Sequence, residues 1–183
     1  MAPNATMFHL QIELSDVDRQ TYEALELRLA RHPSESMRYL VTRTFAYCLS
    51  YEEGIAFSKG GLSSQDEPPV SVHDHLGVLR VWIDVGAPST ARVHRASKAS
   101  QRVAIYGASN LADLRGDAAA GHVHHASDID VWTFDPDFLD ALEPRIERNM
   151  SLTLVRTEGQ LYVTTGGTTL EGALEHSKLL ESA

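Results

Sequence analysis

Residues 78–107 read as a strand, a helix and a second strand, and this order constrains the fold more than any other stretch. VLRVWID (78–84) is a mostly apolar run typical of a buried strand. Pro88 and Ser89 then begin a helix that is expected to reach Arg102, and VAIYG follows as another strand. Two strands joined through a helix are expected to lie parallel in one sheet. The chain is therefore predicted to be an α/β protein.

The same patterns predict the other elements. MFHLQIEL (7–14) alternates apolar and polar residues and predicts a half-buried strand, and Ser15 and Asp16 are expected to cap a helix that reaches about Arg31. Further expected elements are a helix from Ser34 to about Glu53, strands at 55–58, 70–74 and 128–134, helices at 108–116 and 135–146, and C-terminal strands at 150–157, 160–165 and 168–175. The order from Ser34 onward predicts a mixed sheet with helices on its faces and an added C-terminal β-hairpin.

Bulk composition limits the function classes. A length of 183 residues suits one domain, spanning 1–183. No apolar run is long enough to cross a bilayer, no secretory signal is evident, and a single cysteine, Cys48, fits a reducing cytoplasm. Cys48 lies in an apolar helical stretch and is expected to be a packed core thiol.

The charge is unevenly distributed along the chain. The net charge of −9 argues against loose nucleic-acid binding, which depends on neutralising phosphates. However, the segment 85–112 contains no acid and carries Arg92, Arg95, Lys98 and Arg102. An acidic protein therefore has one basic window, which begins directly after Asp84.

Two acids on one predicted hairpin are candidates for a metal site. Asp74 ends one strand near a turn, and Asp84 ends the next apolar run. Two carboxylates with open positions for water suit Mg²⁺ or Mn²⁺, although a simple hairpin keeps these two residues some distance apart. A basic stripe on the following helix, formed by Arg92, Arg95 and Arg102, is a candidate phosphate-binding surface. The alternative is that the stripe is the solvated face of an amphipathic helix.

Four motifs carry a family resemblance. RHPSE, DEP, DHLG and WIDVGAP, in this order and at these spacings, resemble the YaeQ family over essentially the whole chain. The resemblance implies a variant of the PD-(D/E)XK nuclease fold, whose core order is αβββαβ. It also implies a link to transcript elongation, and hence a transcription partner as an alternative to nuclease activity.

The nuclease pattern matches these positions in part. Asp74 matches the first acid, although His73 stands where the pattern has proline, and Asp84 matches the second acid. Gly86 stands where the pattern has lysine, so Lys98 or Arg95 is expected to take the place of that lysine.

The resemblance also implies accessory acids. Glu35 resembles the extra acid that such folds place on their first helix, and Asp66 and Glu67 could add ligands. Each candidate has a structural alternative: Glu35 as a helix-dipole partner, Asp74 as an Asx-turn residue and Lys98 as a surface lysine. The HVHH segment, with His122, His124 and His125, is expected to be a solvated cluster.

Two functions follow from these observations. The first is a cytoplasmic Mg²⁺-dependent nuclease or phosphodiesterase in which Asp74 and Asp84 hold the metal and Glu35 and Lys98 assist. The second is a catalytically inactive nuclease-like domain that binds nucleic acid or a transcription partner. No membrane association is expected, and the sequence gives no oligomeric state.

Overall fold

A computed structural model describes residues 4–59, 66–107 and 110–181. The chain divides into two compact units, and each unit is built from two separate segments. Unit 1 comprises Met1–Val41 and Phe134–Leu174, and unit 2 comprises Thr42–Thr133 and Glu175–Ala183. The first two residues of the helix predicted at 108–116 lie outside the described residues. None of the described helices is long and apolar enough to span a membrane.

The strands of unit 1 follow the order β2-β1-β8-β9-β10. Strand β1 pairs antiparallel with β2 and parallel with β8, while β8, β9 and β10 form successive antiparallel pairs. Their bounds are β1 (Thr6–Asp16), β2 (Thr21–Arg31), β8 (Asn149–Thr157), β9 (Gln160–Thr165) and β10 (Thr168–Lys178), whose last residues belong to unit 2. Helix α4 (Pro136–Leu142) and a 3₁₀ turn, Glu143–Arg145, also lie in this unit. The C-terminal strands were therefore predicted correctly.

The predicted helix from Ser15 to Arg31 is wrong, because this segment contains strand β2. Leu25, Leu27 and Leu29 are buried at every second position and alternate with exposed residues, which is the periodicity of a strand. They face the same way as the buried residues of β1, which are Phe8, Leu10, Ile12 and Leu14. The two strands pair along their full length, from Asp16 with Thr21 to Thr6 with Arg31. Pairing in the hairpin buries the apolar faces of both β1 and β2, and this stabilises the strand more than the weak helical spacing of the leucines favours a helix.

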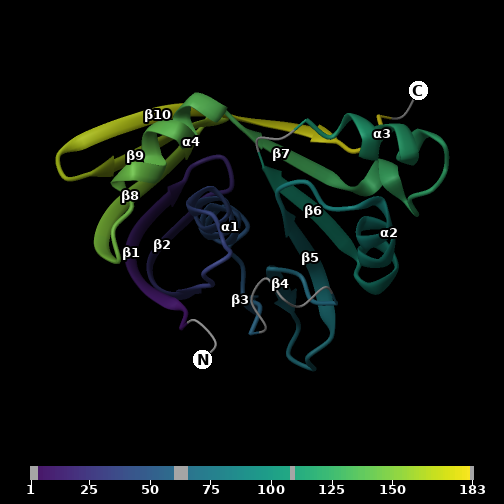
Figure 1. Ribbon diagram of the computed structural model, residues 1–183, viewed down its shortest axis with the longest axis horizontal. Coiled ribbons are helices and arrows are strands. Elements are labelled where there is room, and N and C mark those ends of the chain that lie inside the picture. Colours follow the sequence, from purple (N-terminus) through teal and green to yellow (C-terminus); the bar gives the residue numbers. More distant parts are fainter. Residues whose placement is uncertain (1–3, 60–65, 108–109, 182–183) are drawn as a thin grey trace. The chain divides into compact units, whose positions relative to one another are not determined.

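Unit 2 contains the predicted strand–helix–strand crossover. Strands β3, β4 and β5 pair antiparallel, and β5, β6 and β7 pair parallel. The bounds are α1 (Met37–Leu49, which begins in unit 1), β3 (Ile55–Phe57), β4 (Val70–His73), β5 (Leu79–Val85), α2 (Thr90–Ala99), β6 (Arg102–Gly107), α3 (Ala112–Ala119), the 3₁₀ turn Ala126–Asp128 and β7 (Asp130–Phe134) (Figure 1). The order α1-β3-β4-β5-α2-β6 confirms the predicted sequence of elements.

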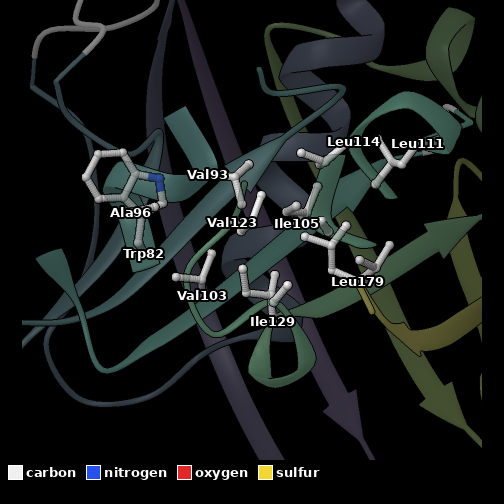
Figure 2. Packing of buried hydrophobic residues seen from close by; sticks show 13 residues of the cluster. Trp82, Val93, Ala96, Val103, Ile105, Leu111, Leu114, Val123, Ile129 and Leu179 are labelled. Atoms are coloured by element: carbon white, nitrogen blue, oxygen red, sulfur yellow. The ribbon is translucent and has the colours of Figure 1, made fainter. Parts of the chain in front are cut away.

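Helix α2 packs on the sheet of unit 2 through a continuous apolar cluster. Figure 2 shows Val93 of α2, Ile105 of β6 and Val123 of the following loop within this cluster. Its other buried members are Trp82, Ala96, Val103, Leu111, Leu114, Ala118, Ala126, Ile129, Val131 and Leu179. Burial of Val93 and Ala96 fixes which face of α2 meets the sheet, and so fixes the direction of the arginines on the other faces.

Cys48 is a buried thiol, as the sequence predicts. It has no exposed surface, and burial raises the pKa of the thiol to about 12. Because the thiolate is the reactive form, we expect no labelling of the folded chain by a thiol reagent at pH 8. The unfolded chain should react at one thiol. Absorbance after mixing with a chromogenic disulfide, with and without urea, measures both; immediate reaction of the folded chain would contradict the prediction.

Candidate functional site

Asp84 is a buried acid at the carboxyl end of a parallel strand. It lies on β5, opposite Ile105 of β6, and is 1% exposed. Its Oδ2 accepts a hydrogen bond of 2.9 Å from Nε1 of Trp82, and its Oδ1 accepts one of 2.8 Å from Nε of Arg92. Burial raises the pKa of Asp84, and the Arg92 guanidinium and the Trp82 indole oppose this rise. Both carboxylate oxygens therefore have donors.

A tight turn brings Arg92 back over Asp84. Gly86 follows β5 with φ of +83°, and its N–H donates to the carbonyl oxygen of Tyr106 at 2.8 Å. This left-handed conformation suits glycine, because a side chain there would be strained. Ser89 then caps α2, with its Oγ accepting from the N–H of Arg92 at 3.3 Å. The strand–turn–helix segment therefore places the Arg92 guanidinium on Asp84, which lies near the end of β5.

The DEP segment meets the same arginine. Nη2 of Arg92 donates to the backbone oxygen of Glu67 at 2.9 Å, and Arg95 forms an ion pair with Asp66. The Glu67 carboxylate accepts a 2.9 Å hydrogen bond from Oγ of Ser58. We call the group formed by Asp66, Glu67, Trp82, Asp84 and Arg92 the Asp84–Arg92 site.

Asp74 lies elsewhere and has a structural role in the turn. Its Oδ1 accepts from the N–H groups of Leu76 and Val78, each at 2.9 Å, and its Oδ2 accepts from Nε of Arg80 at 2.7 Å. The N–H of Val78, together with the Arg80 guanidinium, lowers the pKa of Asp74. These contacts match the Asx-turn alternative.

The β4–β5 ladder does not bring Asp74 and Asp84 together. Val70 pairs with Ile83 at one end, and His73 pairs with Leu79 at the other, next to the turn that contains Asp74. Five positions along a strand separate Leu79 from Asp84, which corresponds to about 17 Å. Each of the two acids is instead engaged by its own arginine.

Glu35 belongs to unit 1 and contacts the residues just before it. Its side chain is buried, and Oε2 accepts from the N–H of His32 at 3.2 Å. Its backbone oxygen accepts from Nε of Arg31 at 2.9 Å. Glu35 precedes α1, which begins at Met37, so these contacts stabilise the turn formed by RHPSE.

The basic stripe is shorter than predicted. Helix α2 ends at Ala99, so Arg102 lies on β6, where it forms an ion pair of 2.6 Å with Glu52. Lys98 is exposed in the last turn of α2. Lys98 lies six positions after Arg92, which places its backbone about 9 Å farther along the helix axis.

Arg92 is the basic residue that contacts Asp84. It was predicted to bind phosphate, and Lys98 or Arg95 was expected beside the acid. The sequence signal for this contact was the position of Arg92, one helical turn after the cap Ser89 and shortly after the strand that contains Asp84.

The histidine-rich segment contacts α2 but does not assemble a metal site. The N–H of His124 donates to Nδ1 of His94 at 3.3 Å, and the rings of His124 and His125 meet edge to face with 4.0 Å between centroids. His125 also lies 3.3 Å from the Asp128 carboxylate. In residues 4–59, 66–107 and 110–181, no three His, Cys, Asp or Glu side chains are placed to hold one ion.

Magnesium fits the chemistry of the Asp84–Arg92 site but not its arrangement. Carboxylate and carbonyl oxygens are the donors that Mg²⁺ prefers. However, the guanidinium of Arg92 already contacts both Oδ1 of Asp84 and the backbone oxygen of Glu67. A divalent ion cannot share that position with a guanidinium because both are cationic. With Arg92 in this position, these residues do not fit a magnesium ion.

Comparison with known proteins places the chain in a family. The family model described as "YaeQ protein" matches residues 1–174. The chain belongs to the YaeQ family. The "Uncharacterized protein YaeQ" of Salmonella typhi is 29% identical over 173 residues, covering 93% of this chain and 94% of that protein. The protein of the same name from Escherichia coli K12 is 28% identical with the same coverage.

Two crystal structures of YaeQ proteins have the same fold. The protein from Xanthomonas axonopodis pv. citri superposes with a TM-score of 0.83 at 25% identity, covering 95% of this chain and 98% of that chain. The protein from Pseudomonas syringae gives a TM-score of 0.84 at 27% identity, with coverages of 94% and 95%. The mixed α/β architecture is therefore that of the YaeQ family.

Proposed function

We propose that this YaeQ chain is a nuclease-like domain that binds nucleic acid through α2 and does not cleave it. The observation that carries the proposal is the ion pair between the Arg92 guanidinium and Asp84. Asp84 is the acid that would bind the metal in the nuclease pattern. A carboxylate that is neutralised by a fixed guanidinium has little remaining capacity to bind a catalytic ion. Cleavage is therefore not expected, whereas phosphate contact through α2 is.

The exposed basic residues of α2 support phosphate binding. Arg95 and Lys98 are exposed and lie three residues apart on α2, whereas Arg92 is held by Asp84 and Glu67. The side chains of Arg95 and Asp66 are 51% and 86% exposed, and ion pairs this exposed contribute little to stability. A nucleic-acid phosphate can therefore replace Asp66 at Arg95. The net charge of −9 disfavours binding of nucleic acid to other parts of the surface.

Binding to labelled single-stranded RNA and duplex DNA, measured by fluorescence anisotropy, tests this proposal. We expect binding at low salt that weakens as salt rises, without cleavage. Arg95→Gln should lower the slope of log affinity against log salt by about one. Arg28→Gln is the matched control, because Arg28, like Arg95, is exposed and paired with an acid, here Glu26, but lies in unit 1. Absence of binding at low salt, or equal effects of both variants, would overturn the proposal.

The competing proposal is a Mg²⁺- or Mn²⁺-dependent nuclease or phosphodiesterase. It is favoured by the position of Asp84 at the carboxyl end of a parallel strand, where open α/β sheets place ligands, next to the backbone of Glu67. It requires Arg92 to leave Asp84. Incubating the same nucleic acids with either ion tests it: cleavage that is lost in Asp84→Asn would establish it and overturn the non-cleaving proposal. The transcription partner implied by the resemblance stays an expectation.

A further inference from the structure

One side chain holds together two oxygens from separate segments of unit 2. Nε of Arg92 donates to Oδ1 of Asp84 at 2.8 Å, and Nη2 donates to the backbone oxygen of Glu67 at 2.9 Å. One acceptor lies on β5 and the other precedes β4. Both are hard oxygen donors of the kind that divalent cations bind. The guanidinium therefore stands where these two donors converge.

The surroundings keep the guanidinium in that position. The side chains of Asp84 and Arg92 are 2% and 21% exposed, so the carboxylate is almost fully removed from water. The Arg92 guanidinium carbon lies 5.4 Å from the centroid of the Trp82 ring. The Trp82 indole N–H donates a hydrogen bond to Oδ2, the other carboxylate oxygen of Asp84. A carboxylate buried to this degree needs a cation beside it. Arg92 supplies that cation from within the chain.

We propose that Arg92 is a built-in cation that fills a latent divalent-metal site made by Oδ1 of Asp84 and the backbone oxygen of Glu67. While the guanidinium is present, its charge and its hydrogen bonds exclude a metal ion. Removing the guanidinium without unfolding the chain leaves a buried carboxylate beside a carbonyl oxygen and space for water, which is a magnesium- or manganese-type donor set. This proposal does not depend on whether α2 binds nucleic acid.

Manganese titration by calorimetry tests the proposal on the full chain without nucleic acid. We expect no saturable binding to the wild type and one saturable site in Arg92→Ala. Arg92→Lys keeps a positive charge and should gain no site. Arg95→Ala is the matched control, because it frees the exposed carboxylate of Asp66 and leaves Arg92 on Asp84. Adding Asp84→Asn to Arg92→Ala should remove the new site.

Three results would overturn the proposal. The first is that Arg92→Ala folds but does not bind Mn²⁺ saturably. The second is that the wild type binds Mn²⁺ as tightly as Arg92→Ala does. The third is that Arg92→Ala still binds Mn²⁺ when Asp84→Asn is added. Protection of the Cys48 thiol reports whether unit 2 is folded in each variant. If Arg92→Ala fails to fold, Arg92→Gln, which is neutral and similar in shape, is used in the same titration with the same expected gain.

Discussion

Replacing Arg156 by methionine is expected to lower the free energy of unfolding by about 3–5 kcal/mol. Arg156 of β8 pairs across the sheet of unit 1 with Asp16 of β1. Its Nη1 lies 3.5 Å from Oδ2 of Asp16, and its Nε lies 3.2 Å from the carboxylate of Asp18. Asp16 has no exposed surface, so methionine would leave a buried carboxylate without the Arg156 guanidinium.

The dependence on pH gives this prediction a second readout. Burial raises the pKa of Asp16 even beside Arg156, and the pKa should rise further when the guanidinium is removed. A raised pKa in the folded chain means that acid favours folding, so the loss of stability should shrink as pH falls through that pKa. Urea denaturation followed by circular dichroism, at pH 7 and in mild acid, measures both effects.

Two comparisons make the Arg156 prediction decisive. Arg28→Met removes an exposed arginine paired with Glu26 and should cost less than about 1 kcal/mol. Adding Asp16→Leu to Arg156→Met replaces the buried pair by apolar side chains and should restore most of the stability. If Arg156→Met is as stable as Arg28→Met, the pair does not stabilise the fold as described.

Substituting Gly54 by alanine is expected to cost about 2–4 kcal/mol, from backbone strain together with overlap. Gly54 has φ of +89°, and a Cβ at this position would lie 2.0 Å from the carbonyl oxygen of His73. The N–H of His73 also donates to the Gly54 oxygen at 3.1 Å, so the two backbones cannot separate without losing this bond. Thermal unfolding of the variant measures the cost.

Gly77 provides the control for Gly54. It has φ of +78°, but nothing lies within 4 Å of the position where its Cβ would be. Gly77→Ala therefore carries backbone strain without overlap and should cost about 1 kcal/mol. The difference between the two variants isolates the overlap with His73. Equal costs would show that the backbones near Gly54 are farther apart than described.

Local patterns in the sequence predicted most of unit 2 and misread one strand of unit 1. The run that ends at Asp84 and the cap at Ser89 are properties of short segments, so the strand and the helix after it could be recognised. The segment around Leu27 fits a helix and a strand almost equally well. Its pairing with β1 decides between them, and pairing is not visible from one segment.

The candidate site was harder to predict because it depends on distances between elements. Asp74 and Asp84 were expected to lie some distance apart on a simple hairpin, and the β4–β5 ladder keeps them apart. The contact between Asp84 and Arg92 depends on the left-handed turn at Gly86. The sequence therefore identified the residues of the site but not which of them meet.

The parallel pairing of β1 with β8 has a consequence for synthesis of the chain on the ribosome. Leu10 pairs with Met150, 140 positions later, whereas in the β1–β2 hairpin it pairs with Leu27, which is close in the sequence. The hairpin can therefore form early, but one long edge of β1 stays unpaired until almost the whole chain has been made. An unpaired edge with alternating apolar side chains is a site for aggregation. A nascent or truncated chain that stops before β8 should need chaperone protection that the finished protein does not.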